Sequence, residues 1–591
     1  MTEDSTKSQN RLDRKDAIAM LVLTVLTLFL LMKGLGSYGF WDPWEPKYAI
    51  TITEMVERGD YITPYYLGLP RWTKPIGIYW AMLVTSAIFG FNEFGGRLPS
   101  VLFALGAVLF TYYFLRKLHS RRVAILAADI LMTIPHFFYM ARQAMPDMML
   151  TFFLCTAMGY FALARFGPPE KARLHFALFY ASASLSFLTK GPVGCAIILL
   201  AMMLFWSLNF RPELLRDWKS AVPAFLQFMK AYRVWSGLVI FLVISVPWYA
   251  AEIAIHGMDY VSTFFGWESF DRFNETIRGH TGLVDYYVLT VWHGMYPWCG
   301  LFMAGLCFYA VNRLRKLDDE SRIYWFYLAW ATATFLLFTW AGTKLSHYIL
   351  PLAPSLAVVT AFIWDDYFKK DVPAWVGPVI LLTIILSVLP LRDFLTQNNK
   401  YIFDTFTSKR ELRYVEVEFP LKLLGGLWAG VMLLAFLRRR SWVITILIFC
   451  VAYGNGIFFL HHAFPNHAVR RTTKFYLDTY LEKRKPHSQL ILYCDGFRES
   501  MDYYFPEDEF QRFERGDEKE MLRILRNEKD MYVIVDTDNN RYFRQHVKSL
   551  GDQRWQSIRR DHDEFYLLTN DESSQVDNLE RFRKMKEESG Q

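Results

Sequence analysis

The chain has few charged residues and few cysteines for its length. Asp, Glu, Lys and Arg make up 21% of its 591 residues, while hydrophobic residues make up 53%. This composition excludes an ordinary soluble protein of several domains. The six cysteines form no CxxC pair and no Cys/His spacing typical of zinc, and five of them lie in apolar segments. We therefore expect neither a disulfide framework nor a structural zinc site.

Other patterns are absent as well. The sequence has no polybasic tail, no RNA-binding aromatic motif and no internal repeat, so nucleic acid is not an expected partner. The first apolar run follows a polar, basic start at Met1–Lys15 and has no small-residue cleavage pattern. We therefore expect a retained first helix and not a cleaved signal peptide.

Thirteen apolar stretches are long enough to cross a bilayer, which predicts a polytopic α-helical membrane protein. A further apolar stretch, 75–91, is shorter, and we expect it to lie along the outer surface. The thirteen stretches centre on residues 17–36, 97–115, 123–140, 148–166, 174–189, 192–209, 234–253, 287–311, 323–341, 346–366, 373–393, 420–437 and 441–461.

Basic residues concentrate in alternate connections between these stretches. Short cytoplasmic loops are enriched in Lys and Arg. If 75–91 does not cross, the basic loops 116–122 and 438–440 lie in the cytoplasm together with the N-terminus. The same orientation places the first loop, 37–96, and the C-terminal part on the outer side.

The C-terminal part has a different composition from the rest. It is dense in charge, with strand patterns at 489–494, 531–537 and 564–569 and a helical pattern at 518–527. Strands alternating with helices predict a small soluble α/β domain. The expected division is a cytoplasmic N-terminus at 1–16, a transmembrane domain at 17–461 and an extracytoplasmic α/β domain at 462–591.

The first outer loop carries two carboxylates beside the bilayer, within "GFWDPWEPKYA" (39–49). Pro46 suits the first turn of a helix and Glu45 suits its cap. The residues that follow have the pattern of an amphipathic surface helix. Either Asp42 or Glu45 is a candidate for activating a nucleophile. The alternative is that Glu45 only caps the helix and Asp42 only faces water.

Two further ionisable residues stand at the ends of apolar stretches. Asp147 lies at the outer mouth of a span, where an ionisable group is costly and marks a candidate functional site. A helix cap or an ion pair with Arg142 is the alternative. Lys74 heads the surface stretch 75–91, where a lysine that only reaches toward water is the alternative.

Lysines also occur on the side opposite to the cytoplasmic bias. Lys190 lies in a short turn between two spans, and Lys344 lies with His347 and Tyr348 in another. A lysine can merely anchor a helix end. Two of them on the outer side are better explained by a cationic site for an anionic lipid head group.

Arg272 and Arg278 lie among aromatic residues in the outer loop 254–286. A solvated loop is the alternative, but guanidinium groups bind phosphate through two hydrogen bonds. Carboxylates and cations from five outer loops therefore converge on one membrane face. This convergence predicts a site where a phosphate is held and a nucleophile is activated.

Five ordered motifs in the sequence resemble the GT-C glycosyltransferases that use polyprenyl-phosphate sugars. Within them, the chain is similar to the bacterial lipid A aminoarabinose transferases and to the protein O-mannosyltransferase superfamily, over roughly residues 17–461. The motifs are "WEPKYA…EMVERGDYITP", "TKPIGIYW", "MPDMMLTFF", "FLTKGP" and "KLSHYILPLAP".

The resemblance implies a fold, a reaction and a location. The fold is a polytopic GT-C membrane domain of about thirteen transmembrane helices with an outer α/β domain. The reaction is inverting transfer of a sugar from a polyprenyl-phosphate donor to a glycolipid or protein acceptor. The location is the bacterial inner membrane, among membrane lipids, with the active site and the C-terminal domain on the periplasmic side.

The resemblance also assigns site residues. Glu45, Lys47 and Tyr48 fall on an acidic–x–Arg–Tyr pattern, with Lys in place of Arg. The positions that match motifs of the donor pocket are Asp147, Lys190, Lys344 and Tyr348, and the motifs also contain Lys74 and His347.

The chain departs from the family at two positions. Trp44 stands where the family has its usual aspartate, while Asp42 stands two residues earlier. Thr73 stands where the family has an acid before the Lys-Pro pair. The second departure weakens the expectation of a divalent metal, so we assign no metal ligand and leave a metal cofactor open.

We expect a single displacement at the sugar. Lys190, Lys344 and an arginine of the 264–280 loop hold the donor phosphate and stabilise it as it leaves. Asp42 or Glu45 deprotonates or orients the acceptor hydroxyl, and Tyr348 donates a hydrogen bond.

Two other functions remain open at this point. One is a flippase or transporter of lipid-linked sugars, which typically has repeats or broken helices with charges near the bilayer midplane. The other is a membrane-anchored interaction protein whose C-terminal domain does the work. The flippase fits less well because the charges here lie at one face, and the anchored protein leaves the convergence of five loops unexplained.

Overall fold

The computed structural model contains two compact units. The helical unit comprises Met1–Leu35, Glu54–Gly90 and Phe94–Leu460, and the α/β unit comprises Gly36–Thr53, Phe91–Glu93 and His461–Gln591. The structure describes residues 12–207, 226–227, 229–271, 285–300, 302–303, 306, 319–369, 430, 441–458, 460–461, 471–494, 499–505, 510–514, 516–527, 530–536, 539–540, 543–545, 555–561 and 565–570.

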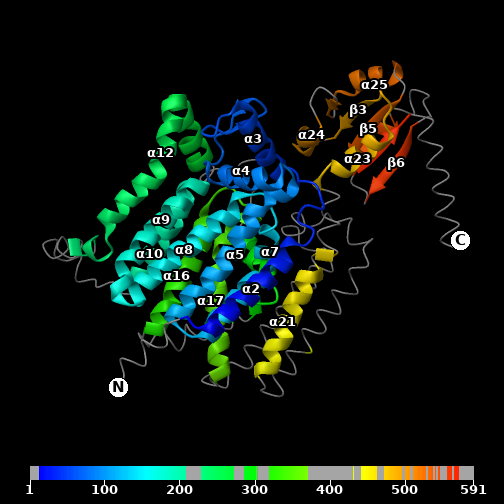
Figure 1. The fold of residues 1–591 in the computed structure, drawn as a ribbon. Helices are drawn as coiled ribbons and strands as arrows, with labels where there is room; N and C mark the ends of the chain where they lie inside the picture. The colour runs from blue at the N-terminus through cyan, green and yellow to red at the C-terminus, as the bar shows by residue number, and fades with distance from the viewer. Residues whose placement is uncertain are drawn as a thin grey trace, which may run out of the picture. The chain divides into compact units, whose positions relative to one another are not determined.

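The helical unit is a bundle built mainly from the apolar stretches (Figure 1). Two short strands and three short 3₁₀ or π segments join its helices. The helices are α2 (Arg14–Met32), α4 (Gly77–Phe89), α5 (Glu93–Leu118), α6 (Arg121–Thr133), α7 (Pro135–Met140), α8 (Pro146–Phe166), α9 (Ala172–Lys190), α10 (Pro192–Ser207), α12 (Val234–Val261), α14 (Asp285–Gly294), α16 (Asp319–Trp340), α17 (Ala353–Lys369) and α21 (Ser441–Phe458). Helix α3 (Glu45–Arg58) is divided between the units, with its residues up to Thr53 assigned to the α/β unit. The short elements are β1 (Tyr65–Tyr66), β2 (Leu69–Pro70), η1 (Pro169–Lys171), η3 (Ser262–Asp271) and η4 (Ser346–Leu352).

The protein is a multi-pass membrane protein. Within the described ranges, six helical segments are long and apolar enough to cross a membrane. They are Arg14–Met32, Glu93–Leu118, Pro146–Phe166, Val234–Glu268, Ser321–Trp340 and Ser346–Asp366. The expected stretch 373–393 and nearly all of 420–437 lie outside the described residues, so the total of thirteen stays a prediction.

The expected span 123–140 is not a single helix. The stretch 123–140 is divided into α6 and α7, because Ile134 has an extended backbone (ψ 117°) and Pro135 starts the next helix. Proline disfavours helical geometry at the residue before it and cannot donate its own backbone hydrogen bond. The apolar pattern indicated burial along this stretch but did not locate the break.

The expected surface stretch 75–91 forms α4. This helix has 13 residues, about 20 Å of length at 1.5 Å per residue, which is too short to cross a hydrocarbon core of about 30 Å. It packs against α8 and α9. A Cβ atom at Gly77 would lie 2.8 Å from the backbone oxygen of Leu188, so only glycine allows this close approach.

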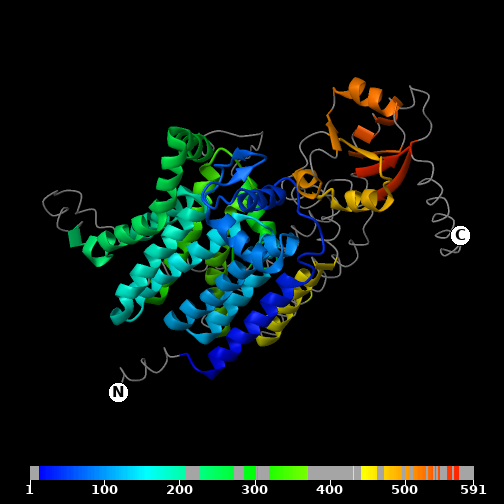
Figure 2. The same cartoon turned by 45° about the horizontal axis from the view of Figure 1, so that its top comes forward.

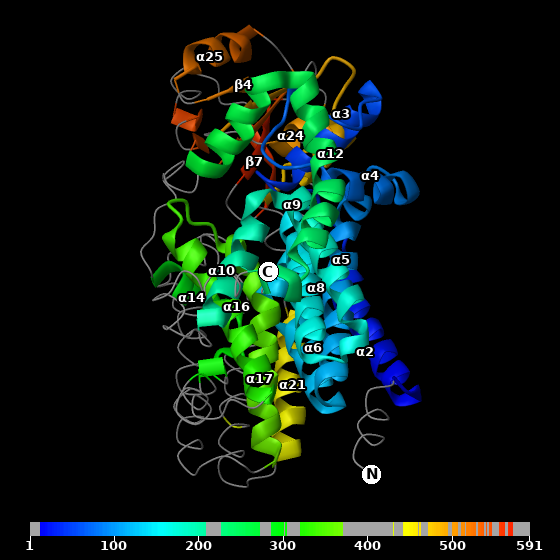
Figure 3. The ribbon, with the colours of Figure 1, turned by 90° about the vertical axis from the view of Figure 1, so that its left-hand side faces the viewer.

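Helix α8 lies at the centre of the bundle (Figure 3). In the most apolar stretch of α8, 89% of the residues are buried, whereas the figure is 22% for the corresponding stretch of the span Val234–Glu268. That second span instead exposes large hydrophobic side chains, among them Trp235, Val239 and Val243. An apolar face turned outward is expected where the surrounding medium is lipid. The polar groups placed at the ends of α8 are therefore held by a well-packed core.

The α/β unit contains a five-stranded mixed sheet with the order β4-β3-β5-β7-β6. Strands β3, β4 and β5 are parallel, and β7 runs antiparallel to β5 and β6. The strands are β3 (Gln489–Tyr493), β4 (Phe510–Phe513), β5 (Met531–Asp536), β6 (Gln556–Asp561) and β7 (Phe565–Thr569), and the helices are α23 (Lys474–Lys483), α24 (Glu499–Tyr504) and α25 (Glu518–Asn527).

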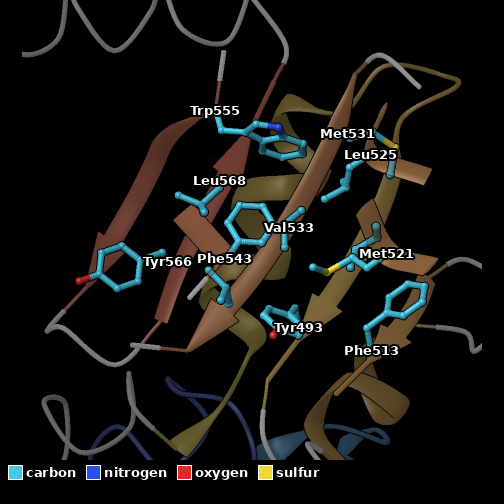
Figure 4. Packing of buried hydrophobic residues seen from close by; sticks show 12 residues of the cluster. Tyr493, Phe513, Met521, Leu525, Met531, Val533, Phe543, Trp555, Tyr566 and Leu568 are labelled. Atoms are coloured by element: carbon cyan, nitrogen blue, oxygen red, sulfur yellow. The ribbon is translucent and has the colours of Figure 1, made fainter. Parts of the chain in front are cut away.

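Both faces of this sheet are covered, which is why β5 is a continuous apolar run. Successive side chains of a strand point to opposite faces. Val533 packs with Met521 and Leu525 of α25 on one face (Figure 4). Ile534 packs with Tyr480 of α23 on the other, and Figure 2 shows these two helices on opposite sides of the sheet.

The expected strands at 489–494, 531–537 and 564–569 correspond to β3, β5 and β7, and the expected helix at 518–527 is α25. Strands β4 and β6 were not predicted, because the sequences FQRF and QSIRRD are short and polar. The boundary of the domain at residue 462 stays a prediction.

Candidate active site

The residues predicted for the site fall into both units. Lys74, Asp147, Lys190, Lys344, His347 and Tyr348 belong to the helical unit, and Asp42, Glu45, Lys47 and Tyr48 belong to the α/β unit. Arg272 and Arg278 lie outside the described residues.

Asp147 and Lys190 form a buried ion pair in the helical unit. The Nζ atom of Lys190 lies 2.5 Å from Oδ1 of Asp147, and the side chains are 9% and 2% exposed. Asp147 follows Pro146 in the first turn of α8, and Lys190 is the last residue of α9. An acid at a helix start and a base at a helix end are both electrostatically favoured. The packing of α8 against α9 brings these two ends together.

Three more predicted residues surround this pair. The Nζ atom of Lys190 lies 4.6 Å from the ring centre of Tyr348, a cation–π distance. The ring of His347 meets that of Tyr348 edge-on at 4.9 Å. His347 and Lys74 both interact electrostatically with the Asp147 carboxylate. We call these five residues, Lys74, Asp147, Lys190, His347 and Tyr348, the lysine–aspartate cluster.

Arg142 was the alternative partner of Asp147 from sequence. Its guanidinium group is buried and donates hydrogen bonds to the backbone oxygens of Leu31, at 2.7 Å, and Lys33, at 2.8 Å. These oxygens end α2. Asp147 instead forms its short ion pair with Lys190. This pairing could not be predicted from the sequence because the two residues are far apart along the chain.

The ammonium group of Lys344 lies at the C-terminal end of α16. It donates hydrogen bonds to the backbone oxygens of Phe338, Thr339 and Ala341, at 3.0, 2.5 and 2.5 Å. Three donors at the carbonyl end of α16 form a C-terminal cap. The residue is buried, and desolvation lowers the pKa of its ammonium group.

An apolar cavity of about 420 Å³ lies among α8, α9, α10 and α12. It is lined by aromatic and aliphatic side chains, including Phe179, Ile198 and Phe241. Within the part of the chain that the structure describes, no three His, Cys, Asp or Glu side chains lie close enough to hold a metal ion together.

In the α/β unit, Asp42 is buried against the start of α24. Its Oδ1 atom accepts a hydrogen bond from the backbone N of Ser500 at 2.7 Å, and its Oδ2 atom accepts one from the Ser500 hydroxyl at 2.5 Å. Its own backbone N donates to the oxygen of Arg471 at 2.6 Å. The side chain is only 5% exposed.

Glu45 is the first residue of α3 and is also buried. Its Oε2 atom accepts a hydrogen bond from the backbone N of Trp41 at 2.8 Å. Lys47 forms an ion pair with Glu499, with Nζ and Oε1 2.7 Å apart, and Tyr48 is buried.

Sequence reasoning missed Glu499 and Ser500 as neighbours of the first loop. Both lie more than 450 positions along the chain from their partners Lys47 and Asp42. They stand in a polar segment with no pattern that distinguishes them from solvated residues, so no signal in a single sequence could have identified them. Glu93 was missed as well, and it binds Lys474 at 2.5 Å and Tyr504 at 2.7 Å within the same unit.

Comparison with known proteins identifies a matching family and several relatives. Residues 73–248 match the family described as dolichyl-phosphate-mannose-protein mannosyltransferase. The undecaprenyl phosphate-alpha-4-amino-4-deoxy-L-arabinose arabinosyl transferase of Aeromonas salmonicida is 30% identical over 59% of this chain and 62% of its own length. The enzyme of the same name from Edwardsiella ictaluri is 30% identical over 54% of this chain and 55% of its own. The chain thus spans somewhat more than half of the length of each of these two relatives.

The fold is shared more completely. The structure of ArnT from Cupriavidus metallidurans bound to undecaprenyl phosphate superposes with a TM-score of 0.68, covering 94% of this chain and 98% of that one at 19% identity. The family match, the relatives and this common fold confirm that the chain resembles the GT-C glycosyltransferases of the aminoarabinose transferase type, as its ordered motifs predicted.

Proposed function

We propose that this protein is an integral-membrane glycosyltransferase that moves a sugar from a polyprenyl-phosphate donor to an acceptor of the cell envelope, with inversion. The buried Asp147–Lys190 pair within the lysine–aspartate cluster carries the proposal. One carboxylate stands among two lysines and a histidine, and this excess of positive charge suits a phosphate. The names of the relatives, which include undecaprenyl phosphate, support the same donor class.

The reaction is a single displacement at the anomeric carbon. An acceptor oxygen forms the new glycosidic bond while the bond between the anomeric carbon and the phosphate oxygen breaks. The electron pair of that bond leaves with the polyprenyl phosphate. Lys190, only 9% exposed, stabilises the developing charge because it is already in place and shielded from water. Asp42 or Glu45 accepts the acceptor proton or orients the acceptor hydroxyl, and a phosphate acceptor needs no base.

The polyprenyl chain lies between helices in this proposal. The apolar cavity among α8, α9, α10 and α12 supports it, since its lining suits a branched hydrocarbon. Lys190 ends α9, and the cavity lines an earlier part of that helix, around Phe179. A donor held at Lys190 could therefore extend its chain along α9.

The location follows the charge distribution of the sequence. We place residues 1–16 in the cytoplasm, 17–461 in the inner membrane as the catalytic domain, and 462–591 on the periplasmic side with the active site. The acceptor is a lipid A-like glycolipid or a protein of the envelope, and the donor and membrane lipids are the other partners.

The test combines purified protein, a labelled undecaprenyl-phosphate sugar and extracted envelope acceptors. We expect Lys190→Ala to reduce kcat/KM about 10²-fold, since one stabilising donor is lost in the transition state. Lys190→Arg keeps the charge and should retain part of the activity. Lys171→Ala is the matched control, because Lys171 is an exposed lysine beside the opposite end of α9. Full activity of Lys190→Ala would refute the assignment.

Removing Lys190 leaves Asp147 buried without its counter-charge, which can unfold the protein. A binding measurement on the wild type and on Tyr348→Ala avoids this difficulty. Undecaprenyl phosphate alone should raise the unfolding temperature of the wild type, and less so that of Tyr348→Ala. Translocation of the labelled lipid across vesicles without any transfer would instead favour a flippase.

A further inference from the structure

The Asp42 carboxylate is part of a buried hydrogen-bond group. Both of its oxygens accept from Ser500, one from the backbone N and one from the hydroxyl. The Ser500 hydroxyl donates its only hydrogen to Asp42. The Thr473 hydroxyl, whose Oγ1 lies 2.8 Å from the Ser500 Oγ, is therefore the donor in the bond between these two hydroxyls. The backbone N of Thr473 donates to the same oxygen at 3.1 Å. All of these residues belong to the α/β unit.

This group also orients Glu45. The residue before Asp42 is Trp41, and its backbone N donates to the Glu45 carboxylate at 2.8 Å. On the other side, the backbone N of Phe40 donates to the Tyr504 hydroxyl at 2.7 Å. Tyr504 and Ser500 both lie on α24, so this one short helix holds residues 40–42 at two points.

A general base must present a lone pair to the proton that it removes. Asp42 directs both carboxylate oxygens at Ser500. The hydrogen bonds of the Asp42 carboxylate are those of a residue that holds the backbone in place. The family's usual aspartate is Trp44 here, so the displaced acid at position 42 need not have kept that aspartate's role.

We propose that Asp42 is a positioning residue, that Ser500 is its partner, and that the two hold the backbone which orients the Glu45 carboxylate. Ser500 and Tyr504 thereby fix the segment from Phe40 to Glu45 within the α/β unit. This inference rests on the proposed transferase function and assigns a role to the C-terminal residues.

The decisive variants are Asp42→Asn and Asp42→Ala. Asparagine can accept from the backbone N of Ser500 and donate to its hydroxyl, so it keeps the anchor without the charge. We expect Asp42→Asn to retain kcat within about threefold, and Asp42→Ala to lose about tenfold or more in kcat with the donor KM unchanged, as a transition-state effect. Asp478→Ala, at an exposed acid on α23, is the matched control.

Ser500→Ala tests the partner. It removes one of the two hydrogen bonds and should lower kcat less than Asp42→Ala does. The double variant should be no worse than Asp42→Ala alone, since both substitutions break the same interaction. Amide hydrogen exchange should rise at residues 40–45 in Asp42→Ala and stay unchanged in β3 and β5, which separates loss of the anchor from unfolding.

The opposite results are equally clear. If Asp42→Asn loses about 10² to 10⁴-fold, as removal of a general base does, Asp42 is the catalytic acid and the proposal is wrong. Wild-type kcat in both Asp42→Ala and Ser500→Ala would also overturn it. If the wild type transfers no sugar at all, the proposed function fails, while the exchange at residues 40–45 still reports whether the anchor exists.

Discussion

Lys190 and Lys344 are both lysines near the C-terminus of a helix, but their ammonium groups have different surroundings. Lys190 faces a carboxylate and an aromatic ring. Lys344 faces three backbone oxygens of its own helix end. Carbonyl groups at a helix end are neutral acceptors with partial negative charge, so they occupy the donors of Lys344 without cancelling its charge. The two lysines therefore respond differently to substitution.

We expect Lys344→Met to lower stability more than donor affinity. Methionine keeps the length of the side chain but leaves the carbonyl groups at the end of α16 without their cap, at a cost of about 1–3 kcal/mol. The measurement is thermal unfolding in detergent beside the donor KM. Lys344→Arg, which keeps its donors, is the control. A raised donor KM at unchanged stability would instead place Lys344 at the phosphate, as its motif suggested.

At the scale of elements, α4 is a short helix that sits close against longer ones. Gly77 begins it and follows Lys74 in the same motif, and a Cβ atom there would meet both the backbone oxygen of Leu188 and the side chain of Met149. Leu188 and Met149 each lie two residues from a member of the Asp147–Lys190 pair. The start of α4 thus packs against residues that neighbour the Asp147–Lys190 pair.

Gly77→Ala is therefore expected to disturb the site through packing. The methyl group has a backbone atom 2.8 Å away, so α4 must shift, and overpacking of this kind costs about 1–3 kcal/mol. We expect a lower unfolding temperature and a higher donor KM. Gly266→Ala is the control, because nothing lies within 4 Å of its added Cβ atom. Equal behaviour of the two variants would show that this contact is unimportant.

At the scale of the whole molecule, orientation rests on the distribution of basic residues. The apolar helices make the protein a multi-pass one, and the basic connections assign its sides. Single cysteines in a background without the native ones test this assignment. We expect an impermeant maleimide to label Glu482→Cys in intact cells, and Lys171→Cys only after the membrane is opened. Labelling in the reverse order would invert the topology and place the C-terminal residues in the cytoplasm.

Much of the fold could be predicted from local patterns. Apolar length predicted the helices, and alternation with charge predicted β3, β5, β7 and α25. Patterns of this kind act over a few residues and reflect burial of a face. They missed the break at Pro135, where a backbone restriction outweighs an apolar pattern, and they missed β4 and β6, which are polar strands at the two edges of the sheet.

The candidate site could be predicted only in part. The ordered motifs identified Asp147, Lys190 and Tyr348, and the structure brings these three together. The partners of Lys344 and Asp42 did not follow from any motif. The sequence alone does not distinguish a lysine that binds a phosphate from one that caps a helix end, because the difference lies in the residues that surround it in the folded structure.

The sequence by itself determined that this chain is a helical membrane protein resembling the lipid-linked sugar transferases, since length, hydropathy and motif order are local properties. The tertiary structure alone decided which charges meet. Asp147 pairs with Lys190 because α8 and α9 pack together, and Asp42 meets Ser500 because residues more than 450 positions apart fold into one unit. Electrostatic interactions act through distances in space, and those distances exist only once the chain has folded.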